Sequence, residues 1–578
     1  MTGPDGPADA LTLRVLGALH REDVLGLRTD GVLQHRADGP WLAGPRLALP
    51  VAEDGFQSRH RARRPLLELD GTAIGGLDAI LDAVAALADP RDRSGHLAFA
   101  EECRQARTAE RLQRATRDTV LAGLAARLGA DPADWKGHAG TLGFDTLAAR
   151  RHHPVHPTGH ARAGLDEDAL LAHAPEHHPE FALRWVVLPP TAGLDLGPAP
   201  LPGRWPSPAD LGLPGPGTAL PVHPLTAAAL PLGDLPGARL ADRPYLTVRP
   251  TLSMRTVALA DDPAVHLKLP LATSTLGLRN RRTVKPGTLA DGAAAERLLA
   301  AVLAREPRFA GRILHADEQC WAHSGHELLA VLVRRQPPGL DDAVIAPLAA
   351  LLAVAPGGRT VLEHLADRFF DRNPVRLYDT LLRLLLDWQT TLFRHGIALE
   401  SHQQNIALVL DRADGRTRLR LLFKDDDGLR VNTARLGGLG RRAEEFDDAR
   451  IRVDDDRPLT DLFATITGHL CTGSLAFGLA HRGLAPLPHT LGLLRLRLTE
   501  SLDRIGAAGA PLHAALLEAE SLPVKAMVSA GTLLDKARSG ASDINKHYTT
   551  GPNYLRAARA WAPTPATGPS HTPAGAPV

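Results

Sequence analysis

A run of polar residues directly after an apolar helix constrains the fold of this chain more than any other feature. Residues 395–405 read HGIALESHQQN, and their polar side chains crowd together at Glu400, His402, Gln403, Gln404 and Asn405. Before this run, apolar side chains recur at helical spacing from Leu381 to Leu392, and Gly396 occupies a position typical of a helix C-terminal cap. Because a core cannot bury so many unpaired polar groups, the run is predicted to belong to a site.

Two strands are predicted to follow the polar run. Residues 406–411 (IALVLD) and 418–426 (RLRLLFKDD) flank a turn at Asp414-Gly415, which predicts a β-hairpin. Its far end carries three carboxylates, Asp425, Asp426 and Asp427. Asparagine and aspartate oxygens are hard ligands that suit Mg²⁺, and a histidine can face phosphate, so this pattern favours a nucleotide with its metal.

Length and charge limit the remaining possibilities. A chain of 578 residues is too long for one core and predicts roughly two to four domains. Its 44% hydrophobic and 23% charged residues are typical of a soluble globular protein. Lys plus Arg number 66 against 65 acidic residues, so no net field points to nucleic acid or to an anionic membrane.

The cysteines and the N-terminal segment indicate a cytoplasmic protein. Cys103, Cys320 and Cys471 are far apart, and neither a disulfide framework nor zinc-type spacing is visible. The first residues include acids and have no long apolar run, which argues against a signal peptide. No segment approaches 18 uninterrupted apolar residues, so no membrane span is expected.

A second polar region alternates in the way that strands do. Residues 246–249, 253–259 and 265–269 predict an antiparallel meander. Alternation places Ser253 and Arg255 on one face, and it places Lys268 on the same face as His266. A sheet face with such groups suits a triphosphate, because fixed cations neutralise charge with little rearrangement; an ordinary solvated sheet face is the alternative. No GxxxxGK[ST] loop is present.

A histidine-rich segment precedes the meander. Prolines interrupt its histidines, so it cannot be a helix that presents metal ligands at i and i+4. Rigid X-Pro geometry holds such side chains in place, and Arg162 can meet a carboxylate with two parallel hydrogen bonds. A metal site, a solvated loop and a substrate-carboxylate site are all open for this segment, whose histidines are His152, His153, His156 and His160.

Several of these segments, taken in order, resemble the IucA/IucC family of NRPS-independent siderophore (NIS) synthetases. Residues 395–405 resemble its HGxxxExHxQN signature, and residues 152–165 (HHPVHPTGHARAGL) resemble GHPxHPxxKxRxGF. Residues 219–224 (ALPVHP) resemble LPVHPWQ. The segments TLSMRTV (251–257) and HLKLPLATSTLGLR (266–279) resemble those that line the family's ATP pocket, and PVKAMVSAGTLL (523–534) resembles its late lysine segment. The resemblance extends over roughly residues 130 to 560.

The resemblance implies an α+β fold shaped as a three-part cupped hand, with an antiparallel sheet and a helical C-terminal part. Residues 1–140 are then an N-terminal thumb-like domain, 141–375 a β-rich fingers domain, 376–560 a mainly helical palm and 561–578 a disordered tail. It also implies adenylation of a carboxylic acid, with citrate or a related acid as the default, using ATP and Mg²⁺. The acyl group then passes to an amine, hydroxylamine or alcohol. Homodimers are common in the family.

The resemblance assigns roles to individual residues. Catalytic roles fall to His402, Arg279 and Lys268. Residues expected at ATP are Ser253, Arg255, Thr256, Lys268, Thr275, Glu400, His402, Gln404, Asn405 and Asp426. Those expected at Mg²⁺ are Glu400, Asn405, Asp425 and Asp426. Those expected at the acid or another anionic substrate are His153, His156, Arg162, Thr275, Arg279 and Lys525. The arginine cluster around Arg279 is too dense to single out one residue, and an ordinary helix lysine is the alternative for Lys525.

The chain departs from the family motif at two positions. His160 stands where the motif has Lys, and His152 stands where it has Gly. A permanent cation has therefore been replaced by a titratable group, which leaves the usual acid substrate open. A non-catalytic binding protein on the synthetase scaffold is one reading of these changes.

A small-molecule phosphotransferase is the alternative from another reaction class. His395-Gly396, followed by Asn405 and the aspartates, echoes a kinase-type H-G-D-x-x-x-x-N loop. Against it, Ile397 stands where the catalytic Asp should be, and no Gly-rich loop precedes residues 266–271.

Overall fold

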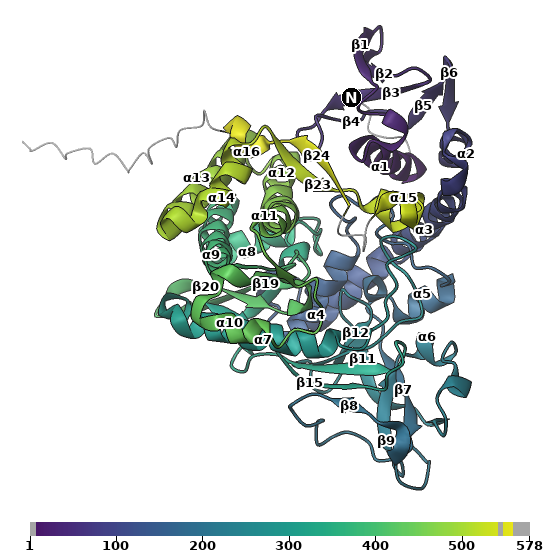
Figure 1. Cartoon of the computed structure of the whole chain (residues 1–578), viewed down its shortest axis with the longest axis vertical. Helices are drawn as coiled ribbons and strands as arrows, with labels where there is room; N and C mark the ends of the chain where they lie inside the picture. The colour runs from purple at the N-terminus through teal and green to yellow at the C-terminus, as the bar shows by residue number, and fades with distance from the viewer. Residues whose placement is uncertain (1–6, 541–546, 559–578) are drawn as a thin grey trace, which may run out of the picture.

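Helices and largely antiparallel sheets are mixed along the whole chain in the computed structural model, which describes residues 7–540 and 547–558 (Figure 1). Parallel pairing is limited, within these residues, to β14 with β20 and β21 with β22. The predicted α+β class is confirmed. The tail predicted at residues 561–578 lies outside the described residues.

The N-terminal part packs three helices around a six-stranded sheet. The helices are α1 (Pro7–Arg21), α2 (Leu77–Leu87) and α3 (Arg93–Leu128). The strands are β1 (Val32–Arg36), β2 (Gly39–Ala43), β3 (Leu47–Glu53), β4 (His60–Ala62), β5 (Leu66–Leu69) and β6 (Thr72–Gly75). Leu16, Leu49 and Phe99 lie in the core between these elements.

The middle of the chain forms a nine-stranded sheet in the order β10-β7-β11-β12-β13-β16-β15-β8, with β9 paired to β7. Its strands are β7 (Phe181–Leu188), β8 (Asp195–Leu196), β9 (Thr218–Val222), β10 (Arg239–Leu240), β11 (Tyr245–Pro250), β12 (Thr256–Leu259), β13 (Val265–Lys268), β15 (Asp317–His323) and β16 (Ala330–Arg335). The predicted meander is confirmed as β11-β12-β13. Its second strand begins only at Thr256, however, because residues 252–255 form a turn in which Met254 has φ 62°.

The polar run joins a buried helix to a second, four-stranded sheet. Helix α9 (Pro374–Arg394) ends at the predicted place, and Gly396 follows with φ 77°. The sheet has the order β14-β20-β19-β17, and its strands are β14 (Ile313–His315), β17 (Val344–Pro347), β19 (Ile406–Ala413) and β20 (Arg416–Phe423). The predicted hairpin is confirmed, with Ile406 opposite Phe423 and Ala413 opposite Arg416.

Helices cover these sheets and build the C-terminal part. Those in the middle of the chain are α4 (Gly137–Ala149), α5 (Glu167–His173), α6 (Pro224–Ala227), α7 (Thr288–Arg305) and α8 (Val361–Phe369). Those after the hairpin are α10 (Gly440–Ala443), α11 (Arg457–Leu462), α12 (Ser474–His481), α13 (Leu487–Ile505), α14 (Ala510–His513), α15 (Lys536–Ser539) and α16 (Tyr554–Ala557). A small sheet joins β18 (Ile397–Ala398), β21 (Arg430–Asn432) and β22 (Arg452–Val453).

One helical run in this part is unusually apolar. Helices α11 and α12 are joined by a π-helical segment, Phe463–Gly473. By length and composition alone, the run Arg457–His481 could cross a membrane, but 89% of its most apolar window is buried inside the protein. Such burial is typical of the core helix of a folded domain.

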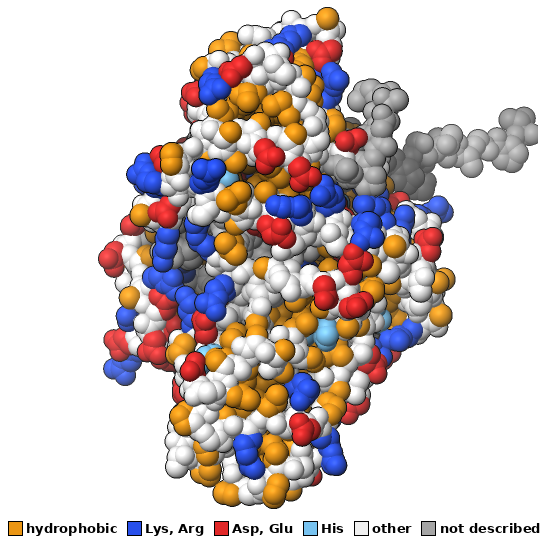
Figure 2. Space-filling view, turned by 90° about the vertical axis from the view of Figure 1, so that its right-hand side faces the viewer, with side chains coloured by type: hydrophobic (Ala, Val, Ile, Leu, Met, Phe, Trp, Pro, Cys, Tyr) orange, Lys and Arg blue, Asp and Glu red, His pale blue; other side chains and the backbone are white. Residues whose placement is uncertain are grey.

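The C-terminal strands return to the N-terminal part. Strands β23 (Ser521–Lys525) and β24 (Tyr548–Pro552) pair with each other and lead from the C-terminal helices toward α1 and α3 (Figure 1). Val528 and Leu533 then join the core between α1 and α3, and the Thr532 hydroxyl donates to Glu102 at 3.0 Å. The predicted boundaries at residues 140, 375 and 560 stay predictions. On the face in Figure 2, acidic and basic side chains are interspersed.

Candidate active site

A cavity of about 350 Å³ lies where the polar run, the meander and the C-terminal strand meet. The predicted residues that line it are His153, Arg162, Ser253, Arg255, Lys268, Thr275, Glu400, His402, Gln404, Asn405, Asp425 and Lys525. Side chains predicted from five separate segments are thus brought together. A pocket of this size, with charged and polar side chains set among a comparable share of apolar ones, suits a small ligand that carries charge.

Lys268 is the centre of a buried ion cluster in this cavity. The lysine is 4% exposed, and its ammonium group donates to Asp425 and, at 3.0 Å, to Asp427. Burial alone would lower the pKa of Lys268, but the carboxylates of Asp425 and Asp427 raise it. The lysine is therefore a fixed positive charge that the protein holds in place before any ligand binds.

The carboxylate of Asp425 is held by a second cation. Arg334 lies 3.0 Å from the same Asp425 oxygen, and its Nε donates to Glu318 at 2.5 Å. Burial alone would raise the pKa of Asp425, yet Lys268 and Arg334 keep it well below its usual value. Asp425 also has a left-handed backbone with φ 62°, a conformation that costs energy in a non-glycine residue and is often found at functional sites.

The polar run is fixed to the C-terminal strand. Lys525, at the end of β23, donates to Oε1 of Glu400 at 2.9 Å. Gly428 approaches the same glutamate so closely that an added Cβ would meet the Glu400 Cβ at 2.8 Å, so only glycine fits there. The sequence left an ordinary helix lysine as the alternative for Lys525; the structure places it on a strand, 6% exposed and paired.

His402 faces the cavity as a neutral donor. Its Nδ1 accepts the backbone N–H of Gln404 at 3.3 Å, so in the neutral ring the proton resides on Nε2. Burial lowers the pKa of His402, although Glu400 and Asp425 oppose this effect. The ring can therefore donate a hydrogen bond to a phosphate oxygen without itself carrying charge.

The histidine-rich loop forms the other end of the cavity. His153 Nδ1 accepts backbone N–H groups of Val155 at 3.3 Å and His156 at 2.9 Å, which fixes its ring. The Arg162 guanidinium donates to the carbonyl oxygens of Gly159 at 3.0 Å and Ala161 at 3.1 Å. These bonds shape the loop and leave part of each side chain at the cavity wall.

Four predicted site residues do not line this cavity, which corrects their expected placement. The Arg279 guanidinium donates to the Ala530 carbonyl at 2.9 Å and joins two loops. Thr256 is 1% exposed within β12, and His156 is 1% exposed beside Thr158. Asp426 is 4% exposed and lies 3.1 Å from His315 Nδ1, on the other side of the loop from Asp425.

Other charged residues line the cavity although the sequence gave them no site role. Arg282 lies at the wall, and its guanidinium has no hydrogen-bond partner among the residues that the structure describes. Burial and the nearby Arg255 lower the pKa of Arg282 to about 9, so it remains a cation at neutral pH. Arg151 and Asp427 line the cavity as well. The dense arginine cluster was the only signal for Arg282, and it did not distinguish this residue from Arg279.

The kinase-like sequence pattern at residues 395–397 has a structural role. His395 lies 3.0 Å from Glu306, Gly396 caps α9, and Ile397 is buried in β18 opposite Val431. None of these three residues lines the cavity. A phosphotransferase would need a catalytic base at Ile397, and this buried side chain cannot act as one.

Over 95% of its length the chain has the fold of siderophore synthetases of known structure. It superposes on ATP-bound aerobactin synthetase IucA from a hypervirulent pathotype of Klebsiella pneumoniae with TM-score 0.70 and 18% identity, covering 95% of this chain and 99% of that one. The petrobactin biosynthesis protein AsbB from Bacillus anthracis str. Sterne gives TM-score 0.70 and 16% identity, covering 95% and 96%. Aerobactin synthetase IucC from the same Klebsiella pathotype gives 0.67 and 20%, covering 95% and 98%. No curated protein sequence matches.

Family models match two parts of the chain. The IucA / IucC family model matches residues 144–193 and 215–353, and a model described as ferric iron reductase FhuF-like transporter matches residues 377–538. The chain thus has the fold of the aerobactin synthetases IucA and IucC, and about a third of it, residues 144–193 and 215–353, is similar to the IucA / IucC family.

Proposed function

We propose that this protein is an ATP-dependent siderophore synthetase that adenylates a di- or tricarboxylic acid, citrate or a related acid, and condenses it with an amine, hydroxylamine or alcohol. The observation that carries the proposal is the cavity itself. It combines the buried Lys268 ion cluster with His402 and with the unpartnered Arg282, and the fold around it is the synthetase fold.

ATP is assigned to the end of the cavity near the meander and the polar run. Lys268 and Arg255 present fixed positive charge, and His402 adds a neutral donor. Ser253 and Thr275 add hydroxyl groups, and Gln404 and Asn405 add amides. Preorganised donors of this kind stabilise the charge that develops on phosphate oxygens because they need little rearrangement during the reaction.

The proposed chemistry has two steps. A carboxylate oxygen of the acid attacks the α-phosphorus of ATP, and pyrophosphate leaves. The nitrogen or oxygen nucleophile then attacks the acyl carbon, loses its proton, and AMP leaves. Free carboxylate is a poor electrophile because its leaving group would be oxide, whereas AMP is a good leaving group. The protein mainly positions the reactants and stabilises charge.

Mg²⁺ is assigned to the carboxylates beside Lys268. Asp425 and Asp427 line the cavity with Glu400 and Asn405, and their oxygens are the hard ligands that Mg²⁺ prefers. Because Lys268 already pairs with both aspartates, one or two of these carboxylates would hold the ion, and the ion would supply charge to neutralise the phosphates.

The acid is assigned to the end of the cavity that the histidine-rich loop forms. His153 and Arg162 lie there. Arg282, whose guanidinium has no hydrogen-bond partner among the described residues, takes the substrate role that was predicted for Arg279. A free guanidinium recognises a carboxylate through two parallel hydrogen bonds. We further infer a cytoplasmic location, since all three cysteines are buried and unpaired. A homodimer stays a prediction that sedimentation checks.

The test is incubation of the protein with ATP, Mg²⁺ and a panel of di- and tricarboxylic acids, with hydroxylamine as trap. AMP, pyrophosphate and a hydroxamate from one acid are the expected products, and they name the acid. His402→Gln should lower the rate about 10- to 100-fold, whereas His35→Gln, at an exposed position in β1, should not change it. ADP formed without hydroxamate would overturn the proposal in favour of phosphoryl transfer.

A further inference from the structure

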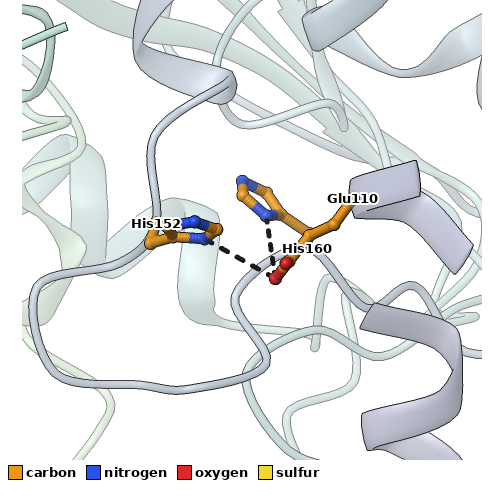
Figure 3. Close-up of side chains that lie close together, drawn as sticks. All are labelled: Glu110, His152 and His160. Carbon is orange, nitrogen blue, oxygen red and sulfur yellow. Dashed lines mark ion pairs between the residues drawn. The ribbon is translucent and has the colours of Figure 1, made fainter. Parts of the chain in front are cut away.

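Two histidines and a glutamate from distant parts of the chain converge at the edge of the cavity (Figure 3). Glu110 comes from the middle of α3, and His152 and His160 come from the loop that follows α4. One ligand atom from each residue lies within 4.8 Å of the other two. Within residues 7–540 and 547–558, this is the one group of three histidine, cysteine or carboxylate side chains with such spacing.

The orientation of His160 leaves a lone pair directed at Glu110. Its Nε2 lies 3.1 Å from the Ala149 carbonyl oxygen and 3.0 Å from that of Arg151, and carbonyl oxygens only accept hydrogen bonds. Nε2 therefore carries the proton, and Nδ1, 3.9 Å from Glu110 Oε1, is an acceptor in the neutral ring. Metal-binding histidines are typically oriented in this way, by a backbone carbonyl on the second nitrogen.

His152 completes the group from the cavity side. Its Nδ1 lies 3.6 Å from the same Glu110 oxygen, and the ring centroids of His152 and His160 are 5.0 Å apart. For bonds of about 2.1 Å to a tetrahedral ion, ligand atoms lie about 3.4 Å apart. The spacings of 3.6 and 3.9 Å to Glu110 need only a small contraction, and the His152 side chain, 44% exposed, has room to move toward His160.

The charges around the group permit a cation. The Arg14 guanidinium donates to Glu110 Oε1 and opposes a metal ion, but a carboxylate has lone pairs for more than one partner. With Arg14 on one lone pair, the Glu110 carboxylate keeps others for an ion that both imidazoles also face.

We propose that Glu110, His152 and His160 bind one divalent transition-metal ion, and that the ion presents an open coordination position to a carboxylate of the acid substrate. Two imidazoles and one carboxylate are a ligand set of zinc and of ferrous iron, and three protein ligands leave positions for another molecule. His152 and His160 also line the cavity beside Arg162. The assignment of a carboxylate ligand rests on the proposed function; the metal site itself does not.

The ion explains the two departures from the family motif together. His160 stands where the motif has Lys and His152 where it has Gly, and both side chains face one glutamate. An amine at position 160 would place one fixed positive charge there. A metal ion held by this group would restore positive charge at the same place.

The first test is titration of the chelator-treated full chain with Co²⁺ in the absence of ATP and acid, followed by visible absorption and calorimetry. One ion per chain is expected, and His152→Gln should weaken binding about 100-fold. His160→Gln should do the same, and the exposed His35→Gln should bind like the wild type. Wild-type protein without Co²⁺ binding, or variants that bind as tightly as it does, would overturn the site.

The second test measures whether a carboxylate binds to the open coordination position of the ion. Succinate, a dicarboxylate that binds free metal weakly, is titrated into zinc-loaded and chelated protein. Binding about 10-fold tighter to the loaded wild type, with no such difference for His152→Gln, supports the open position; equal binding overturns it.

A chain that makes hydroxamate but binds no Co²⁺ overturns the metal site and leaves the synthetase function standing. A chain that binds Co²⁺ here but makes no hydroxamate supports the site while the proposed function fails.

Discussion

Lys525 and Glu400 are 125 positions apart in the chain, and the lysine donates a 2.9 Å hydrogen bond to the Glu400 carboxylate. This pair ties the polar run after α9 to strand β23. Strand β23 leads on to residues packed against α1 and α3, including Val528 and Leu533. The cavity is therefore closed by an ion pair between the centre of the chain and its C-terminal part.

Replacement of Lys525 by Met should lower both activity and stability. The glutamate would lose its partner in a largely buried setting, and we expect about 1 to 3 kcal/mol lower free energy of unfolding. The rate of hydroxamate formation should fall about 10-fold or more. Urea unfolding and initial rates measure the two effects. Lys536→Met, at an exposed position in α15, is the matched control, and equal behaviour of the two variants would show that the pair does not matter.

The two neighbouring aspartates Asp426 and Asp427 should behave differently. Asp427 lines the cavity and lies 3.0 Å from the Lys268 ammonium, so Asp427→Asn should raise the Mg²⁺ concentration needed for half-maximal rate about 10-fold. Asp426 is buried against His315, so Asp426→Asn should lower the melting temperature and leave the Mg²⁺ dependence unchanged. Rates across a Mg²⁺ series and thermal unfolding distinguish them. The reverse pattern would return the metal role to Asp426, where the sequence analysis placed it.

Local patterns predicted the elements that carry the site. The apolar spacing before Gly396, the turn at Asp414-Gly415 and the alternation in the meander each follow from neighbouring residues, and the structure has helix α9, the hairpin and the three strands at these places. The second strand of the meander was predicted to begin at Ser253 but begins at Thr256, and this difference has a physical reason. Met254 packs into a small hydrophobic cluster with a left-handed backbone, which alternation cannot show.

The sequence does not predict which side chains contact one another across the fold. Nothing in the spacing of 425–427 indicates that Asp425 meets Lys268 and Arg334 while Asp426 meets His315. The prolines in the histidine-rich loop excluded only a helical pair of metal ligands at i and i+4, and the third proposed ligand, Glu110, comes from a helix that carried no chemical signal. The sequence therefore predicts candidate site residues by their type, whereas packing sets the partners of each one.

Gly396 should be the most sensitive glycine next to the polar run. Its φ is 77°, and an added Cβ would meet the Asn432 carbonyl oxygen at 2.7 Å. Gly396→Ala is therefore expected to lower the free energy of unfolding by about 2 kcal/mol or more. Gly415→Ala is the matched control, because Gly415 has φ 73° and open space around it, so only the backbone strain of about 1 kcal/mol applies. Equal losses in urea unfolding would show that the close contact carries no cost.

His469 should make stability depend on pH. This residue lies in the π-helical segment that contacts the cavity wall; its Nε2 donates to the Pro523 carbonyl at 3.0 Å, and its Nδ1 lies 3.1 Å from the Tyr554 hydroxyl. Burial lowers its pKa from 6.5 to about 4. The folded state thus favours the neutral ring, while the unfolded chain takes up a proton below about pH 6.5.

It follows that the stabilisation is complete above about pH 6.5 and is lost as the pH falls toward about 4, by on the order of 3 kcal/mol. The measurement is urea unfolding between pH 4 and 7.5 for the wild type and for His469→Gln, which retains a donor but does not titrate. His20 and His178 also have pKa values lowered to about 4, but they contribute equally to both proteins, so the difference between the two curves isolates His469. Parallel curves would mean that this imidazole is as easily protonated in the folded protein as in the unfolded chain. We expect instead that the free energies of unfolding of the two proteins converge as the pH falls. Protonation of His469 removes the stabilisation that its neutral ring gives to the wild type, and the variant has no such ring.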